Sequence, residues 1–154
     1  MKRVLLPLLA LCLCLTACGG GAEEEGYDPA NTAQALLDSG AFSQALDALD
    51  KDTACEALYG GLDPDTVEEC AVYASLSAGA EEIAVFKLSS TEAAGTALTA
   101  LEDRVAEQRE ALESYQPEEV GKLDSAIVEQ KGNTVVLVVA EDAGLARSTL
   151  DGLS

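Results

Sequence analysis

The fold is decided by residues 127–140, which read IVEQKGNTVVLVVA. Two runs rich in β-branched residues, 127–131 and 134–140, flank the pair Gly132-Asn133. A two-residue connection containing glycine is typical of a type I′ or II′ turn between antiparallel strands. The stretch therefore predicts a β-hairpin. Its second strand is apolar at every position from Val135 to Val139, so we expect both faces of that strand to be covered.

A second hairpin and a long helix are predicted upstream. The two strands are expected at Ala71–Leu76 and Ile83–Leu88, with Gly79 in the loop between them. Thr91 is expected to cap the helix that follows. That helix carries apolar residues at helical spacing, which are Leu98, Leu101, Val105, Leu112 and Tyr115.

Further helices are predicted around these hairpins. Asp28-Pro29 and Asp63-Pro64 each combine an N-cap residue with proline at the first helical position. The first helix has an apolar face from Leu36 to Leu49, and Gly40 is expected to end or bend it. A short helical turn is expected from Pro117 to Leu123 and a terminal helix from Asp142 to Leu153.

The element order is then α-β-β-α-β-β-α. It predicts an α+β domain with a four-stranded, mainly antiparallel sheet built from two β-hairpins and packed helices. The domain is expected to span residues 29–154. Residues 83–86 lack polar alternation, as residues 135–139 do, so we expect both faces of the sheet to be covered by other parts of the protein or by a partner. The first helix is the favoured covering, and the alternative is a partner or a homodimer through the sheet face.

The N-terminus predicts a cleaved signal. Lys2 and Arg3 precede an apolar run from Val4 to Leu15, whose twelve residues span about 18 Å as a helix against a hydrocarbon core of about 30 Å. The tetrad Leu15-Thr16-Ala17-Cys18 resembles the lipobox of bacterial lipoproteins. This resemblance implies a signal peptide over residues 1–17 and a diacylglyceryl anchor on Cys18, on the extracytoplasmic face of the cell membrane. The alternative is an ordinary secretory signal.

The segment 18–28 is rich in glycine and glutamate and predicts a flexible tether between the lipidated cysteine and the domain. The net negative charge of the chain limits the kinds of partner that this domain is expected to bind. The sequence has 9 basic and 28 acidic side chains, and cleavage removes two of the basic ones. So acidic a surface repels nucleic acid and favours cationic partners.

Catalytic candidates are few. The sequence has no histidine, which excludes Ser-His-Asp and Cys-His nucleophiles. Cys55 and Cys70 remain after cleavage, and they are either a disulfide pair or two buried thiols. Without histidine they make a poor zinc site, and no metal site or cofactor is predicted.

The loop after residue 58 supplies the remaining candidates. Tyr59, Asp63 and Asp65 are candidates for an interaction loop that contacts a protein or a small ligand. With Glu68 and Glu69, the two aspartates also raise the alternative of a carboxylate-dependent extracytoplasmic enzyme. Their structural interpretation is helix capping, since acids in a first helical turn complement the helix dipole.

Between residues 33 and 153 the chain resembles the small lipoproteins of Gram-positive bacteria that carry the domain of unknown function numbered 4358. The resemblance rests on Leu58-Tyr59-Gly60, Leu62-Asp63, Val72-Tyr73, residues 82–87, Arg104 with Gln108, Tyr115 and residues 132–136. It implies no activity, substrate or cofactor and no catalytic residue. The expected function is a non-catalytic binding or interaction module of the cell envelope.

Overall fold

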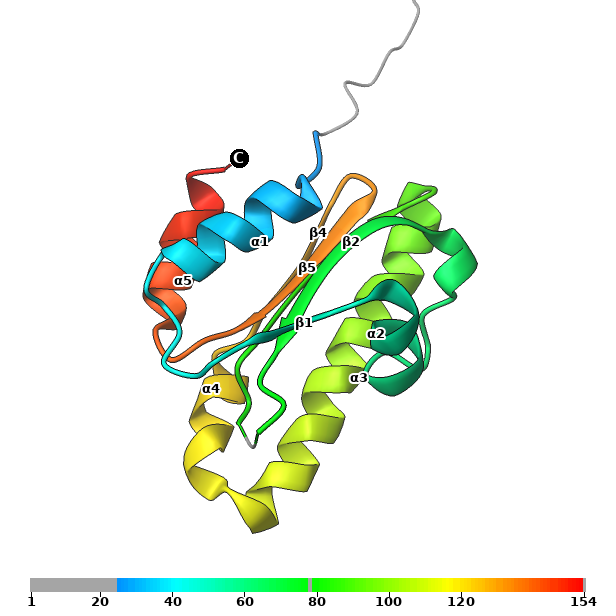
Figure 1. The fold of residues 1–154 in the computed structure, drawn as a ribbon. Coiled ribbons are helices and arrows are strands. Elements are labelled where there is room, and N and C mark those ends of the chain that lie inside the picture. The colour runs from blue at the N-terminus through cyan, green and yellow to red at the C-terminus, as the bar shows by residue number, and fades with distance from the viewer. Residues whose placement is uncertain (1–24, 78, 154) are drawn as a thin grey trace, which may run out of the picture.

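A computed structural model describes residues 25–77 and 79–153 (Figure 1). The predicted signal peptide, Cys18 and most of the predicted tether lie outside these residues. The part of the chain described contains no helix long and apolar enough to cross a membrane.

The sheet has five strands rather than the four predicted. They are β1 (Asp47–Leu49), β2 (Val67–Ala74), β3 (Glu82–Leu88), β4 (Ile127–Lys131) and β5 (Thr134–Val139). The strand order is β1-β2-β3-β5-β4 and every pairing is antiparallel. Both predicted hairpins are present, as β2–β3 and β4–β5. Gly132, in the turn between β4 and β5, has the positive φ of 56° that a two-residue hairpin turn requires.

The fifth strand lies where a helix was predicted. The first helix, α1 (Pro29–Asp38), ends before Gly40, whose φ of 80° is left-handed. The chain then runs to the edge of the sheet, where Asp47 pairs with Ala74 and Leu49 with Val72. The apolar residues beyond Gly40 that suggested a helical face therefore belong to a loop and a three-residue edge strand.

Six further helical segments follow. The α-helices are α2 (Lys51–Ala57), α3 (Thr91–Tyr115), α4 (Val120–Asp124) and α5 (Ala143–Asp151), and the short 3₁₀ segments are η1 (Pro64–Thr66) and η2 (Pro117–Glu119). Asp28, Asp63 and Asp142 cap α1, η1 and α5 through their side chains. Ser90, and not Thr91 as predicted, caps α3 by accepting a hydrogen bond from the amide of Ala93.

Helices cover both faces of the sheet, so the molecule has three layers (Figure 1). On one face, Phe86 and alternate residues of β5 pack with residues of α2 and α3. On the other, Ile83 and Val85 pack with Leu36 of α1 and Leu150 of α5. The prediction that the first helix covers the second face is confirmed, and α5 shares that role. The apolar sheet surface on which the predicted homodimer depended is therefore buried inside the chain.

We expect Leu36→Ala to destabilise the domain by about 2–5 kcal/mol, because Leu36 is fully buried between α1 and the sheet. Urea unfolding followed by circular dichroism measures the change. Asn31→Ala, at an exposed position of the same helix, is the control and should change stability by less than about 0.5 kcal/mol. Equal effects of the two substitutions would contradict the packing of α1 on the sheet.

Candidate functional site

Two adjacent carboxylates, one directly before the central strand β3 and one at its first residue, are both buried. Glu81 is 1% exposed and Glu82 is fully buried. Successive side chains of a strand point to opposite faces, so the two groups enter different layers. A buried carboxylate needs a cation or several hydrogen-bond donors. Glu81 and Glu82 each have a cation and further hydrogen-bond donors around them, and they belong to two separate clusters.

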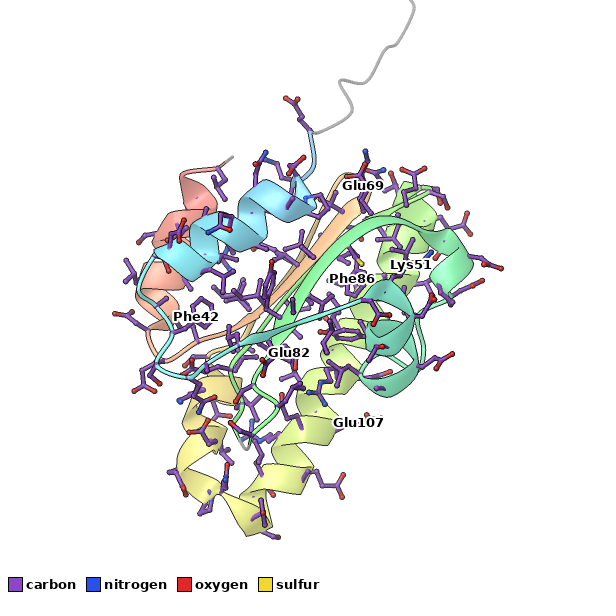
Figure 2. All side chains as sticks on the ribbon, in the orientation of Figure 1. Phe42, Lys51, Glu69, Glu82, Phe86 and Glu107 are labelled. Atoms are coloured by element: carbon purple, nitrogen blue, oxygen red, sulfur yellow. The ribbon has the colours of Figure 1, made fainter. Side chains whose placement is uncertain are left out.

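The first cluster joins Glu82 to Tyr59 and Arg104. The Arg104 guanidinium donates to Glu82 through Nη2 at 2.7 Å and through Nε at 3.2 Å, and the Tyr59 hydroxyl donates to the other carboxylate oxygen. The Tyr59 ring meets Phe86 edge to face, with centroids 5.2 Å apart. Glu82 and Phe86 lie on the inner side of the sheet facing α2 and α3 (Figure 2).

This cluster is held in one charge state. Burial raises the pKa of Tyr59 well above its ordinary value, and the neighbouring Glu82 raises it further, so the phenol keeps its proton. Burial alone would lower the pKa of Arg104, but hydrogen bonds to Glu82 and the charge of Glu82 raise it. Arg104 is therefore a permanent cation, fixed by a bidentate carboxylate contact.

Arg104 also lines a pocket of about 240 Å³ between α2 and α3. Its side chain is 18% exposed, and its Nη1 atom has no hydrogen-bond partner among the described residues. The residues that line this pocket with Arg104 include small ones, among them Gly60 and Gly61. Three exposed carboxylates also line it, and they are Glu56, Asp103 and Glu107.

A neighbouring pocket of about 490 Å³ continues along α3. The two share Gly61, Ala100 and Asp103 in their linings. The second one runs past Thr96 and Thr99 toward the start of the helix. Together they form a groove, which we call the α2–α3 groove.

The second cluster is centred on Lys122 of α4. Its ammonium lies 2.9 Å from Glu81, 3.1 Å from Glu119 and 2.9 Å from Glu141. Hydrogen bonds to these three carboxylates raise the Lys122 pKa, outweighing a burial effect that lowers it. The cluster ties together the β2–β3 connection, η2, α4 and the β5–α5 connection. Lys122 therefore fills the position that a cation would take among these carboxylates.

Further donors support Glu81 and Glu119. Ser43 donates to Glu81 from its amide at 2.9 Å and from its hydroxyl at 2.6 Å, and the amide of Gln44 donates at 3.0 Å. Burial alone would raise the pKa of Glu81, but these bonds and Lys122 lower it. The pKa of Glu119 is likewise lowered, because donors from Ala80, Gln44 and Lys122 outweigh burial.

Of the three residues in the predicted interaction loop, two are exposed and one is buried. Tyr59 is 1% exposed, so the prediction that it contacts a partner is wrong, and its hydroxyl is used inside the protein. Asp63 and Asp65 are exposed, and Asp63 accepts a hydrogen bond from the Asp65 amide as a helix cap. From this loop it is the glycines, Gly60 and Gly61, that reach a pocket.

The acidic residues behind the enzyme alternative do not converge. Glu68 and Glu69 are exposed like Asp63 and Asp65, and Glu69 lies 3.8 Å from Lys87. Across residues 25–77 and 79–153, no group of three or more acidic, cysteine or histidine side chains is placed to hold a metal ion. This segment therefore offers no pair of carboxyls in contrasting environments.

Cys55 and Cys70 are separate thiols in the structure. Both pack in the layer between the sheet and α2–α3. Burial raises the pKa of both, and the nearby Cys70 raises that of Cys55 further. Such thiols are poor nucleophiles at neutral pH. A disulfide between them stays a prediction.

Sequence reasoning missed the roles of Glu81, Glu119 and Lys122 and named Glu82 and Arg104 only through the family resemblance. One signal was available. Glu81 and Glu82 stand directly before an apolar run that lacks polar alternation. Because such a strand is covered on both faces, the residues at its start are buried as well, and buried carboxylates need partners. Residues of the resemblance far apart in the chain, Tyr59, Glu82 and Arg104, meet here. Gln108 lies near them and donates to the carbonyl of Gly79 at 3.4 Å.

Comparison with known proteins bears on the domain. A family model described as "Domain of unknown function (DUF4358)" matches residues 39–140 and confirms the resemblance. No curated protein and no solved structure matches the chain. The match leaves the lipid anchor a prediction.

We expect Lys122→Met to destabilise the domain by about 3 kcal/mol at pH 7, because it leaves buried carboxylates without a cation. In the wild type, the lowered pKa values of Glu81 and Glu119 stabilise the fold above the ordinary glutamate pKa of about 4.3, and this stabilisation is lost as the pH falls below it. In the variant, protonation relieves the repulsion, so the difference between the two proteins should shrink below about pH 5.

Urea unfolding between pH 7 and pH 3 measures this. Lys51→Met is the matched control, because Lys51 is exposed, donates a hydrogen bond to the carbonyl of Pro64 and forms no ion pair with the residues that the structure describes. Its effect should stay within about 0.5 kcal/mol at every pH. If the loss of stability caused by Lys122→Met were the same at every pH, it would contradict the proposal that Lys122 stabilises the fold by neutralising buried carboxylates.

Proposed function

We propose that this chain, which belongs to the family of the domain of unknown function DUF4358, is a membrane-anchored extracytoplasmic lipoprotein whose domain binds a ligand in the α2–α3 groove and catalyses no reaction. The observation that carries the binding role is the position of Arg104. One edge of its guanidinium is fixed on Glu82, its Nη1 atom is bonded to none of the described residues, and its side chain lines the pocket.

The groove has the properties of a preformed binding site. Its cation is oriented before any ligand arrives, because Glu82 and Tyr59 are themselves immobilised in the core. A preorganised donor costs little ordering entropy on binding. The lining includes small residues, with glycine at positions 60 and 61, so main chain and ligand can approach closely.

Binding is favoured over catalysis by the state of the buried carboxylates. Glu81 and Glu119 have lowered pKa values and are ion paired. A general acid at neutral pH needs a raised pKa. Ion-paired carboxylates of this kind fit a structural role.

The proposed anchor is supported by the lipobox-like tetrad that ends at Cys18. The domain begins at one end of the sheet, where the amide of Tyr27 donates to the Thr134 hydroxyl at 2.9 Å and the Tyr27 hydroxyl donates to Glu129 at 2.6 Å. The chain therefore enters beside the β4–β5 turn (Figure 1). Two acyl chains on Cys18 would hold the protein stably at a membrane.

We expect Cys18→Ala to release the protein from the membrane fraction when the full chain is expressed in a Gram-positive host. The wild type should sediment with membranes and partition into detergent, because a diacylglyceryl thioether needs the Cys18 sulfur. Cys14→Ala is the control and should behave as the wild type does. Equal distributions of wild type and Cys18→Ala would contradict the anchor and leave the groove untouched.

The groove is tested by thermal unfolding of the full chain in detergent with four small probes, which are putrescine, succinate, glycine and glycerol. At least one charged probe should raise the Tm of the wild type, since a ligand at about 100 times its Kd adds about 2.7 kcal/mol. Gly60→Leu should abolish the rise, because the position is open on the pocket side and leucine would fill it.

Gly121→Leu is the matched control for that substitution. A Cβ at Gly121 also meets nothing within 4 Å, but the residue lies in α4 beside Lys122. This variant should keep the Tm rise. No rise with any charged probe, or a rise that survives in Gly60→Leu, would refute binding in the groove.

A further inference from the structure

We infer that the ligand of the α2–α3 groove is a small zwitterion with one ammonium and one carboxylate group, that is, an amino acid or a short peptide. This inference rests on the proposed function and adds the ligand's chemical class. Its argument is the arrangement of charges around the pocket.

Arg104 is the least exposed charged residue of the pocket lining, and it favours an anionic or strongly accepting group beside it. Arg104 uses Nε and Nη2 on Glu82, and Nη1 has no partner among the described residues. Guanidinium groups bind carboxylates in preference to neutral acceptors. A carboxylate that reaches Nη1 would complete the hydrogen bonding of Arg104.

The rim requires a cation. Glu56 stands on α2, and Asp103 and Glu107 stand on α3, and all three are exposed carboxylates that line the same pocket. Glu107 is on the side of α3 turned away from α4 in Figure 2. In addition, α2 ends at Ala57 in the pocket wall, and the negative end of a helix dipole favours a positive group.

The balance of charge excludes simpler ligands. Arg104 and Glu82 neutralise each other, so the pocket with its three rim carboxylates is negative overall. A simple anion would be repelled by the rim, and a simple cation would give Arg104 Nη1 no acceptor. Only a molecule with both charges satisfies both ends.

The size of the pocket sets the size of the ligand. At about 240 Å³ it is below the range of about 300–1,000 Å³ that is usual for drug-sized ligands. Its apolar wall consists of small or short side chains such as Ala57, Leu58 and Ala100. This space suits a single amino acid with a small side chain. The adjoining pocket along α3 has room for a second residue.

The test is isothermal titration of the full chain in detergent with glycine, L-alanyl-L-alanine, acetate and methylammonium. We expect either zwitterion to bind at least about tenfold more tightly than acetate or methylammonium, since each half-molecule satisfies only one end of the pocket. Methylammonium or acetate binding as tightly as the zwitterions would overturn the inference while leaving a binding groove. Absence of binding by all four would overturn it too, and the thermal series with putrescine and succinate then decides whether the groove binds anything.

The double substitution Asp103→Asn with Glu107→Gln removes two rim charges and keeps the shape. Zwitterion affinity should fall about tenfold, since two exposed charge contacts are lost. The control is Glu102→Gln with Glu110→Gln, which makes the same change of charge at exposed positions of the same helix outside the pocket lining. It should keep the wild-type affinity. Equal losses in the two double variants would overturn the inference, because they would reflect net charge alone.

Discussion

The structure depends on the neutralisation of two adjacent carboxylates, Glu81 and Glu82, at the start of a strand that is buried on both faces. A buried carboxylate without a partner costs several kcal/mol, so each requires a cation on its own side of the sheet. Arg104 reaches Glu82 from α3, and Lys122 reaches Glu81 from α4. These two pairs tie α3 and α4 to the start of β3, in addition to the apolar packing of the layers.

Local signals predicted most of the fold, and long-range contacts account for what was missed. The turn Gly132-Asn133 and the caps Asp28 and Asp63 depend on residues a few positions apart, so the sequence contains the whole cause. The edge strand β1 has only three residues and exists through its pairing with β2, which no local pattern encodes. Tyr59 was misjudged for the same reason, because a tyrosine in a glycine-rich loop resembles a surface residue until the position of Glu82 is known. The groove was beyond sequence reasoning, since its walls come from α2 and α3, far apart along the chain.

The acidity of the chain also has a structural meaning. The sequence has 28 acidic and 9 basic side chains, and the basic side chains of the described part are largely consumed in internal contacts. Ion pairs take Lys87, Arg104, Arg109, Lys122 and Arg147. Arg104 is the least exposed of the three paired arginines, with 18% of its side chain exposed against 45% for Arg109 and 43% for Arg147. A pocket that places this arginine beside carboxylates offers contacts to both charges of a zwitterion, whereas a plain cation is attracted to acidic side chains in general.

The contacts of Tyr27 have a mechanical consequence. Its amide is bound to Thr134 on β5 and its hydroxyl to Glu129 on β4, and Glu129 in turn accepts a hydrogen bond from Arg147 on α5 at 2.6 Å. A pull on the N-terminal segment is therefore shared at once between the β4–β5 hairpin and the C-terminal helix, instead of unwinding α1 first. Glu129 thus joins the segment before α1 to α5 through two hydrogen bonds. The contacts of the N-terminal segment at Tyr27 therefore involve β4, β5 and, through Glu129, α5, and none of the elements that line the groove.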